Sequence, residues 1–261
     1  MMTRPLSYQI NVGGRLFDLS QPRVMQIVNC SPDSFYPQSS PFSPLASMID
    51  VGAYSTRPGH ADVSIDEEMH RLRAYFNQQR VIDAHSDARH QVLSVDTFRA
   101  DVARMCVEEY GVQMVNDVTG GADGDMFKTV ARLHVPYVLT CSRAHDITHL
   151  SRQVQALRDL GQNDIIIDPG FGFGEGLEDD YYKLSHLEEY HLLELPILVG
   201  ISRKSMIQRV LDCTADEALN GTTALQMYAL MKGVNILRVH DAREADETIK
   251  LYNKLCCLDL A

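Results

Sequence analysis

The sequence predicts an α/β protein, a (β/α)8 TIM barrel with an N-terminal β-hairpin. Short β-branched apolar runs recur about eight times and alternate with stretches of good helix formers. The runs are almost continuously apolar, which is typical of parallel strands that are covered on both faces. A length of 261 residues suits one large domain, so we expect a single domain over 1–261. An open, doubly wound sheet is the alternative.

The first expected element is the hairpin. Residues 8–12 (YQINV) and 15–19 (RLFDL) alternate apolar and polar side chains. Gly13 and Gly14 lie between them and can adopt the positive φ of a tight turn. The expected barrel strands follow at 24–29, 48–54, 91–96, 112–117, 136–141, 164–169, 196–202 and 235–240.

Helices are expected between most of these strands, where apolar residues recur with a period near 3.6. The expected helices cover 65–79, 100–110, 125–133, 150–160, 218–233 and 242–255. The first crossover, between Phe35 and Ile49, is short and contains three prolines. Since proline disfavours a helix interior, we expect the first barrel helix to be missing or truncated to about one turn.

Composition excludes several classes of protein. The formal charge is −11, and the pI is near 5.3. These values argue against a nucleic-acid partner or an anionic membrane surface. The six cysteines form no C-x-x-C pair, which favours buried thiols in a reducing cytoplasm. We expect no signal peptide and no membrane span, because the apolar stretches are too short.

The C-terminal ends of the strands carry the active site in a (β/α)8 barrel. Polar side chains gather at these ends: Asn29, Ser55, Thr56, Arg57, Asp96, Asn116, Asp117, Thr140, Asp168, Ser202, Arg203, Lys204, Arg238 and His240. Polar residues also cap strands and helices, and Asp117 and Asp241 fit that structural role. A full ring of such residues favours a binding site.

The ring has two chemical halves. Asp96, Asn116 and Asp168 offer acceptors and one amide donor, which suits a flat heterocycle rich in N–H groups. Lys204 suits a ring carbonyl or ring nitrogen of the same ligand. The other half suits a phosphate or pyrophosphate and consists of Asn29, Arg57, Arg238 and His240. The amide oxygen of Asn29 suits Mg²⁺. A structural salt-bridge network is the rival interpretation for the arginines.

The local motifs are less specific indicators of function than the ring of polar residues. The glycine-dense segment 168–176 (DPGFGFGEG) lacks a dinucleotide fingerprint, and a simple tight turn explains it about as well as phosphate binding. In 202–205 (SRKS) a strand meets a helix, where the hydroxyls and the helix N-terminus suit a carboxylate. The sequence has no H-E-x-x-H motif and no G-x-S-x-G motif, which disfavours zinc hydrolases and α/β-hydrolases.

Seven motifs together resemble dihydropteroate synthases, a family of pterin-binding enzymes. In chain order they are NCSPDSF (29–35), IDVGAYSTRPG (49–59), SVDTFRADVA (94–103), VNDVTGG (115–121), IDPGFGFG (167–174), VGISRKSMI (199–207) and LRVHDAREA (237–245). The resemblance extends over nearly the whole chain. Related pterin-binding methyltransferases share the SVDT-like and ND-like elements but lack STRPG together with SRKS, which favours the synthase.

The resemblance implies a reaction in which p-aminobenzoate displaces pyrophosphate from (7,8-dihydropterin-6-yl)methyl diphosphate, with Mg²⁺ as cofactor. It assigns Asp96, Asn116, Asp168 and Lys204 to the pterin and Asn29 to the metal or pyrophosphate. It places Thr56, Arg57, Arg238 and His240 at the diphosphate end. Phe35, Pro58 and Ser205 border the aminobenzoate. Of these, Arg57, Lys204, Arg238 and His240 are the expected catalytic residues.

The chain departs from the family in several places. Residues 36–40 (YPQSS) replace an Asp-Gly-Gly stretch, and Thr140, Cys141 and Ser142 replace a Met-His-Met run. Glu175 stands at a usual lysine, and Gly52–Ser55 (GAYS) replaces GGES.

These departures leave two alternatives to an active synthase: a diverged, non-catalytic pterin-binding paralogue, and a structural or interaction protein. The resemblance also implies a homodimer, and the apolar face of 224–231 permits one. The expected partners are therefore small-molecule substrates and a second copy of the chain.

Overall fold

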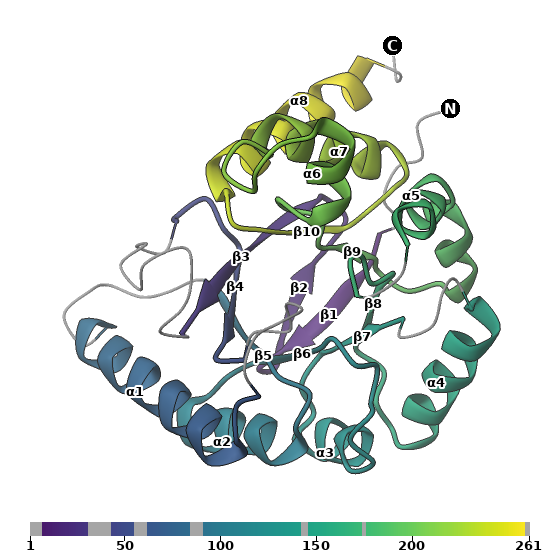
Figure 1. Cartoon of the computed structure of the whole chain (residues 1–261). Helices are drawn as coiled ribbons and strands as arrows, with labels where there is room; N and C mark the ends of the chain where they lie inside the picture. The colour runs from purple at the N-terminus through teal and green to yellow at the C-terminus, as the bar shows by residue number, and fades with distance from the viewer. Residues whose placement is uncertain are drawn as a thin grey trace.

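The computed structural model describes residues 7–30, 43–54, 62–83, 91–141, 146–173 and 176–258. Eight parallel strands form one sheet in the order β8-β7-β6-β5-β4-β3-β10-β9. A bridge between Ile167 and Ile197 joins the two ends of this sheet, so the strands form a ring. Figure 1 looks into the ring, with the helices outside it. The predicted (β/α)8 barrel is confirmed.

Each predicted strand is present, although β9 is shorter than expected. The barrel strands are β3 (Arg23–Asn29), β4 (Met48–Gly52), β5 (Val92–Asp96), β6 (Met114–Asp117), β7 (Tyr137–Thr140), β8 (Ile165–Asp168), β9 (Leu198–Val199) and β10 (Ile236–Val239). The helices are α1 (Ile65–Asp83), α2 (Ala100–Tyr110), α3 (Met126–Leu133), α4 (Ile147–Asp159), α5 (Leu177–Ser185), α6 (Ser205–Leu211), α7 (Leu219–Met231) and α8 (Ala242–Leu258). A 3₁₀ helix covers Leu187–Leu193.

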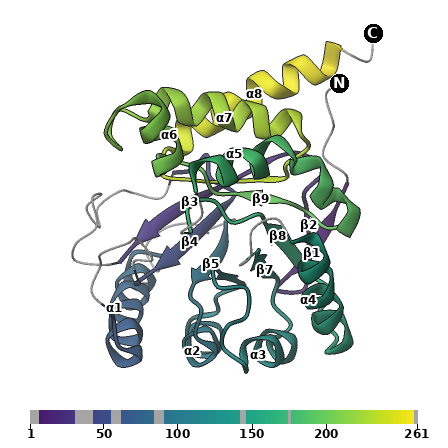
Figure 2. The same cartoon turned by 45° about the vertical axis from the view of Figure 1, so that its right-hand side comes forward.

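Helix α2 illustrates how the outer layer forms. Val102, Ala103 and Cys106 recur at helical spacing and are buried against the sheet. The helix ends at Gly111, whose positive φ of 69° lets its N–H bond back to the last turn. Figure 2 shows the same outer position for α1, α3 and α4, and α7 beside α8. No helix in the described part of the chain has the length and apolar character to cross a membrane.

The prediction about the first barrel helix concerns residues 31–42, which lie outside the described residues. After them, the chain makes a turn before β4 begins at Met48. The N–H of Ser43 donates to Oε1 of Gln26 in β3 over 2.8 Å. The entry into β4 is therefore attached directly to the preceding strand.

The predicted hairpin is confirmed and covers the N-terminal end of the barrel. Strands β1 (Gln9–Val12) and β2 (Arg15–Asp18) pair antiparallel. Ile10, Val12 and Leu19 pack on an apolar layer inside the barrel that contains Met25, Met48, Val92, Met114, Val138, Ile166, Leu198 and Ile236. The N–H of Asn11 also donates to Asp164, just before β8, over 2.9 Å. The hairpin and this layer close the barrel at that end.

Candidate active site at the mouth of the barrel

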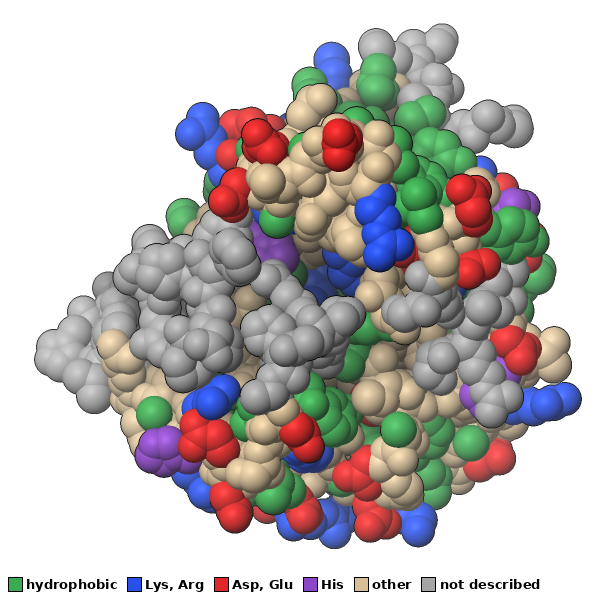
Figure 3. All heavy atoms as spheres, in the orientation of Figure 1, with side chains coloured by type: hydrophobic (Ala, Val, Ile, Leu, Met, Phe, Trp, Pro, Cys, Tyr) green, Lys and Arg blue, Asp and Glu red, His purple; other side chains and the backbone are tan. Residues whose placement is uncertain are grey.

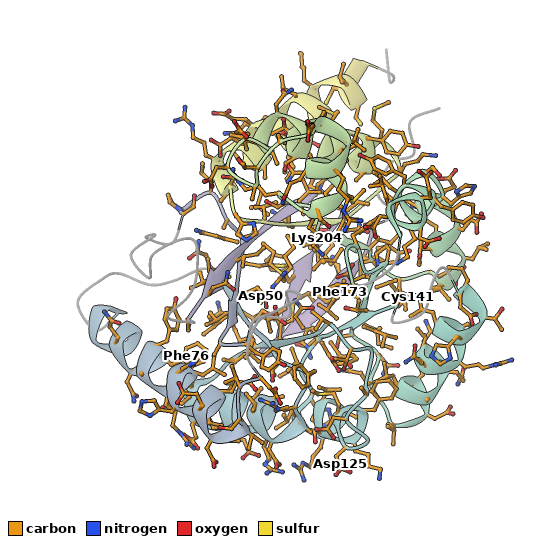
Figure 4. The ribbon with its side chains drawn as sticks, in the orientation of Figure 1. Asp50, Phe76, Asp125, Cys141, Phe173 and Lys204 are labelled. Atoms are coloured by element: carbon orange, nitrogen blue, oxygen red, sulfur yellow. The ribbon has the colours of Figure 1, made fainter. Side chains whose placement is uncertain are left out.

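A layer of polar side chains follows the apolar layer inside the barrel. Side chains alternate between the two faces of a strand, so the residue two positions after each apolar one also points inward. The polar residues among these inward positions are Asp50 of β4, Ser94 of β5, Asn116 of β6, Thr140 of β7, Asp168 of β8 and Arg238 of β10. Figure 4 places Asp50 near the centre of the ring, whereas Phe76 and Asp125 lie among the outer helices.

Asp50 joins three of these side chains, and sequence reasoning missed it. Its carboxylate is fully buried and accepts hydrogen bonds from Ser94 Oγ (2.6 Å), Asn116 Nδ2 (2.8 Å) and Arg238 Nε (2.6 Å). The missed signal is an acid inside the apolar run MIDVG (48–52), at the same inward position as Ser94. Asp50 thus sets the orientation of two predicted site residues, Asn116 and Arg238.

Arg238 also bonds to Asp96, its Nη2 lying 2.5 Å from Asp96 Oδ2. One guanidinium therefore bridges two carboxylates. Burial lowers the pKa of Arg238, but the charges of Asp50 and Asp96 outweigh it and the pKa is raised. Burial raises the pKa of Asp96 to about 7; Arg238 opposes this rise and the charge of Asp50 adds to it. This geometry revises the division of the rim into two halves, because Arg238 contacts a residue of the pterin half.

Asn116 presents its oxygen to the barrel mouth. One N–H of its Nδ2 donates to Asp50, which fixes the orientation of the amide. The buried Oδ1 has no hydrogen-bond partner, and neither has the buried Oγ1 of Thr140 on the adjacent strand. Buried polar atoms without partners are rare in proteins, and these two lie on neighbouring strands, with Thr140 paired to Asp168 of β8 in the sheet register. They fit the polar edge of a bound ligand.

Asp168 ends β8 beside the glycine-rich loop. Its Oδ1 accepts the N–H of Gly170 over 2.8 Å, while burial raises its pKa and the charge of Lys204 opposes the rise. Gly170 has a φ of 73°, and a Cβ there would lie 2.8 Å from the carbonyl oxygen of Cys141. Only glycine allows the loop to approach β7 so closely.

Lys204 reaches the same place from the N-terminal end of α6. Its Nζ donates to the carbonyl oxygen of Phe171 and lies 4.5 Å from the centre of the Phe173 ring. Burial lowers the pKa of Lys204 to about 8, while Asp168 opposes the fall and Arg238 adds to it. Figure 4 shows Lys204 and Phe173 close together near the ring centre. In Figure 3 this region is a hollow with basic side chains at its floor and a histidine at its edge.

The remaining predicted residues lie around this centre. His240 follows β10 at an inward position, with Nδ1 3.2 Å from Ser202 Oγ. Asn29 ends β3 and is half-buried, and Ser205 is exposed at the first turn of α6. Arg203 has a structural role instead, because its Nε and Nη2 bind the carboxylate of Asp241.

Two other predicted site residues, Thr56 and Arg57, lie outside the described residues, as do Phe35, Pro58, Ser142 and Glu175. The residues on either side of segment 55–61 are held together. The Tyr54 hydroxyl donates to Asp62 Oδ1 over 3.1 Å, and Arg99 Nη2 donates to the Val63 carbonyl over 2.7 Å. Buried Glu68 in turn binds Arg99.

Comparisons with known proteins agree with this geometry. Residues 46–240 match the family of pterin binding enzymes. Dihydropteroate synthase from Escherichia coli is 32% identical over 91% of this chain and 93% of its own. The chain belongs to the dihydropteroate synthase family.

Solved structures support the same family. The synthase from Vibrio fischeri superposes with a TM-score of 0.83 and 30% identity, covering 95% of this chain and 98% of its own. The synthase from Xanthomonas albilineans, solved with 4-aminobenzoic acid, has a TM-score of 0.83 and 29% identity over 96% and 98%. The predicted membership of the dihydropteroate synthases is confirmed.

Proposed function

We propose that this chain condenses (7,8-dihydropterin-6-yl)methyl diphosphate with p-aminobenzoate and releases pyrophosphate. The observation that carries the proposal is the set of acceptors at the barrel mouth, Asp96, Asn116 Oδ1 and Asp168, beside the ammonium of Lys204. Three acceptors next to one cationic donor complement a heterocycle with several N–H groups and one carbonyl.

A dihydropterin matches this pattern group by group. The 2-amino and N3–H groups form an amino-pyrimidinone edge that one carboxylate can bind with both oxygens, a role suited to Asp168. Asn116 Oδ1 and Asp96 suit the other N–H groups, and Lys204 suits the ring carbonyl or N5. The Thr140 hydroxyl can donate to N1, the acceptor atom between two donors.

The diphosphate and the second substrate would lie nearer the rim. We assign His240, Thr56 and Arg57 to the diphosphate. We assign Arg238 to the region between the pterin and the diphosphate. Phe35, Pro58 and Ser205 would border p-aminobenzoate. The Xanthomonas albilineans relative was solved with 4-aminobenzoic acid, which supports this second substrate.

Mg²⁺ is the proposed cofactor. The described residues hold no group of three His, Cys, Asp or Glu side chains arranged as metal ligands. Mg²⁺ does not need such a group, because it keeps several waters and uses substrate phosphates with one or two protein oxygens. Asn29 would supply one amide oxygen, and the bound ion would neutralise charge on the leaving pyrophosphate.

The mechanism follows from the charges. Arg57 and His240 stabilise the negative charge that grows on the leaving pyrophosphate, and such stabilisation contributes most when it favours the transition state. The electron-rich pterin supports the cationic methylene that remains. Asp96 and Asp168 hold the ring and stabilise its positive charge. The amine of p-aminobenzoate then attacks the methylene and loses a proton.

A pyrophosphate-release assay with both substrates and Mg²⁺ tests the proposal. We expect turnover that depends on p-aminobenzoate, and calorimetric binding of the pterin. Tight pterin binding without turnover would support the non-catalytic paralogue, and absence of both would contradict the whole assignment.

The homodimer and the cytoplasmic location are part of the proposal. Tyr228 and Met231 of α7 and Leu251 and Leu255 of α8 are exposed apolar side chains on two adjacent helices, which supports a dimer interface. All six cysteines are thiols and none is in a disulfide, which suits a reducing compartment. Light scattering on the purified chain measures the oligomeric state.

Replacing Asp168 by asparagine should weaken pterin binding by on the order of 2–4 kcal/mol, because a buried acceptor becomes half donor. Calorimetry with the pterin measures the loss. Asp164→Asn, just before β8 at the closed end of the barrel, is the control and should leave affinity unchanged. Unchanged binding by Asp168→Asn would contradict the pterin assignment.

Replacing Thr140 by valine separates binding from stability. Valine keeps the shape but removes a buried hydroxyl that has no partner, so the unfolding free energy should stay equal or rise by about 1 kcal/mol. Pterin affinity should fall about tenfold through loss of one hydrogen bond. Thr248→Val on α8, whose hydroxyl bonds to the Glu244 carbonyl, is the control. Equal pterin affinity of the wild type and Thr140→Val would show that the Thr140 hydroxyl does not bind the pterin.

A further inference from the structure

Helix α5 sends two buried charged side chains toward the glycine-rich loop. Asp180 is 3% exposed and Lys183 is 1% exposed, and they lie three residues apart on one face of the helix. The sequence pattern predicts no helix here, and neither residue has a predicted role. An ionised side chain is costly to bury unless it is paired, so the contacts of this pair matter.

Both side chains bind the backbone of the loop. Asp180 Oδ1 accepts the N–H of Gly172 over 2.9 Å. Lys183 Nζ donates to the carbonyl oxygen of Gly170 over 2.6 Å. These bonds hold the peptide groups on both sides of Phe171, whose side chain is fully buried. The direction of the Phe171 carbonyl is therefore set from α5.

That carbonyl is the acceptor for Lys204. The ammonium of Lys204 donates to it, the Phe173 ring lies 4.5 Å away, and a Cβ on Gly172 would lie 3.3 Å from Lys204 Cδ. Residues 171–173 thus surround the Lys204 side chain. A loop that only needed support could be packed by apolar side chains at both α5 positions, without the desolvation cost of two charges.

We propose that Asp180 and Lys183 are positioning residues that hold the Gly170–Gly172 backbone so that its Phe171 carbonyl seats the Lys204 ammonium in the pterin site. The pair acts through the backbone and does not touch the substrate. The pterin part of this inference rests on the proposed function, whereas the seating of Lys204 does not.

The charges around Lys204 determine the direction in which its pKa should change when Asp180 is replaced. Asp168 of β8, Asp180 of α5 and Asp96 of β5 raise the pKa of Lys204, while burial and Arg238 of β10 lower it to about 8. Lys183 faces the same loop from α5. Asp180→Ala removes one of the raising charges and frees the Phe171 carbonyl, so the pKa of Lys204 should fall further.

The decisive experiment follows Lys204 by NMR in protein with labelled lysines. The chain has only six lysines, and the Lys204→Met variant assigns the signal. Asp180→Ala should lower the pKa of Lys204 by roughly half a unit or more. Asp180→Asn loses the same charge but keeps an acceptor for the Gly172 N–H, so it should show a smaller shift. Glu178→Ala, exposed on the same helix, is the control and should show none.

Pterin affinity is the second readout. Asp180→Ala and Lys183→Met should each bind the pterin about tenfold more weakly, whereas Asp180→Asn should stay near wild type. Lys183→Met also covers the case in which Asp180→Ala fails to fold. An unchanged Lys204 pKa in Asp180→Ala, identical behaviour of the two Asp180 variants, or unchanged affinity in Lys183→Met would overturn the inference.

The position of Lys204 and the binding of the pterin are tested by separate measurements. The NMR titration is carried out on the protein alone, so it decides the seating of Lys204 even if the chain binds no pterin. Absence of pterin binding by the wild type would instead contradict the proposed function.

Discussion

Asp50→Asn should lower the unfolding free energy by about 3 kcal/mol and weaken pterin binding about a hundredfold. The Asp50 carboxylate accepts from Ser94, Asn116 and Arg238. An asparagine has one acceptor oxygen and one amide group, so it cannot satisfy these donors. The Asn116 amide would turn to offer its oxygen to the new NH2 group and would present a donor to the ligand.

Urea denaturation and pterin calorimetry measure the two effects. Ser94→Ala is the matched control, because it removes one donor to Asp50 and leaves Asn116 and Arg238 in place. It should cost about 1 kcal/mol of stability and little affinity. Equal pterin affinity of Asp50→Asn and Ser94→Ala would show that Asp50 does not orient Asn116 for the ligand.

Arg238→Met should destabilise the protein by about 3–5 kcal/mol at pH 8, because two buried carboxylates lose their shared cation. The loss should be smaller at pH 5. Arg238 lowers the pKa of Asp96, so its removal raises that pKa beyond about 7. At pH 5 the folded variant then binds a proton more tightly than the unfolded chain, and stability falls as the pH rises through the folded pKa.

Denaturation at pH 5 and pH 8 measures this difference. Arg73→Met is the control, because Arg73 pairs with Glu109 at the surface. This variant should change the unfolding free energy by less than about 1 kcal/mol at either pH. An equal loss for Arg238→Met at both pH values would mean that Asp96 does not take up the proton.

The same variant tests a point on which the sequence is misleading. From the sequence, Arg238 belongs to the diphosphate end, and its loss should affect mainly the diphosphate-bearing ligand. The structure shows that Arg238 also binds Asp96. We therefore expect Arg238→Met to weaken binding of pterins with and without a diphosphate.

The barrel was predictable because each strand is an apolar run of its own, and parallel strands with helical crossovers close in few ways. The rim residues were predictable for the same reason: Asp96, Asn116 and Asp168 are the last inward positions of their strands. The structural role of Arg203 was harder to predict, because β9 ends at Val199 and the alternation of side chains along a strand no longer applies beyond that residue.

The contacts within the polar layer could not be predicted. Asp50 stands in mid-strand, and only the register between β4, β5 and β6 brings it next to Ser94 and Asn116. Asp180 and Lys183 look like surface residues in a short, highly charged stretch, LEDDYYKLS. Their burial depends on how α5 packs against the glycine-rich loop, which no local pattern encodes.

The hairpin at the foot of the barrel has a kinetic consequence. Ile10, Val12 and Leu19 pack on the apolar layer and close that end, so a ligand reaches the polar layer from the mouth of the barrel. A molecule seated on the polar layer must enter before any companion at the rim and leave after it. Initial-rate and product-inhibition measurements should therefore show a compulsory order, with the heterocycle first in and its condensed form last out.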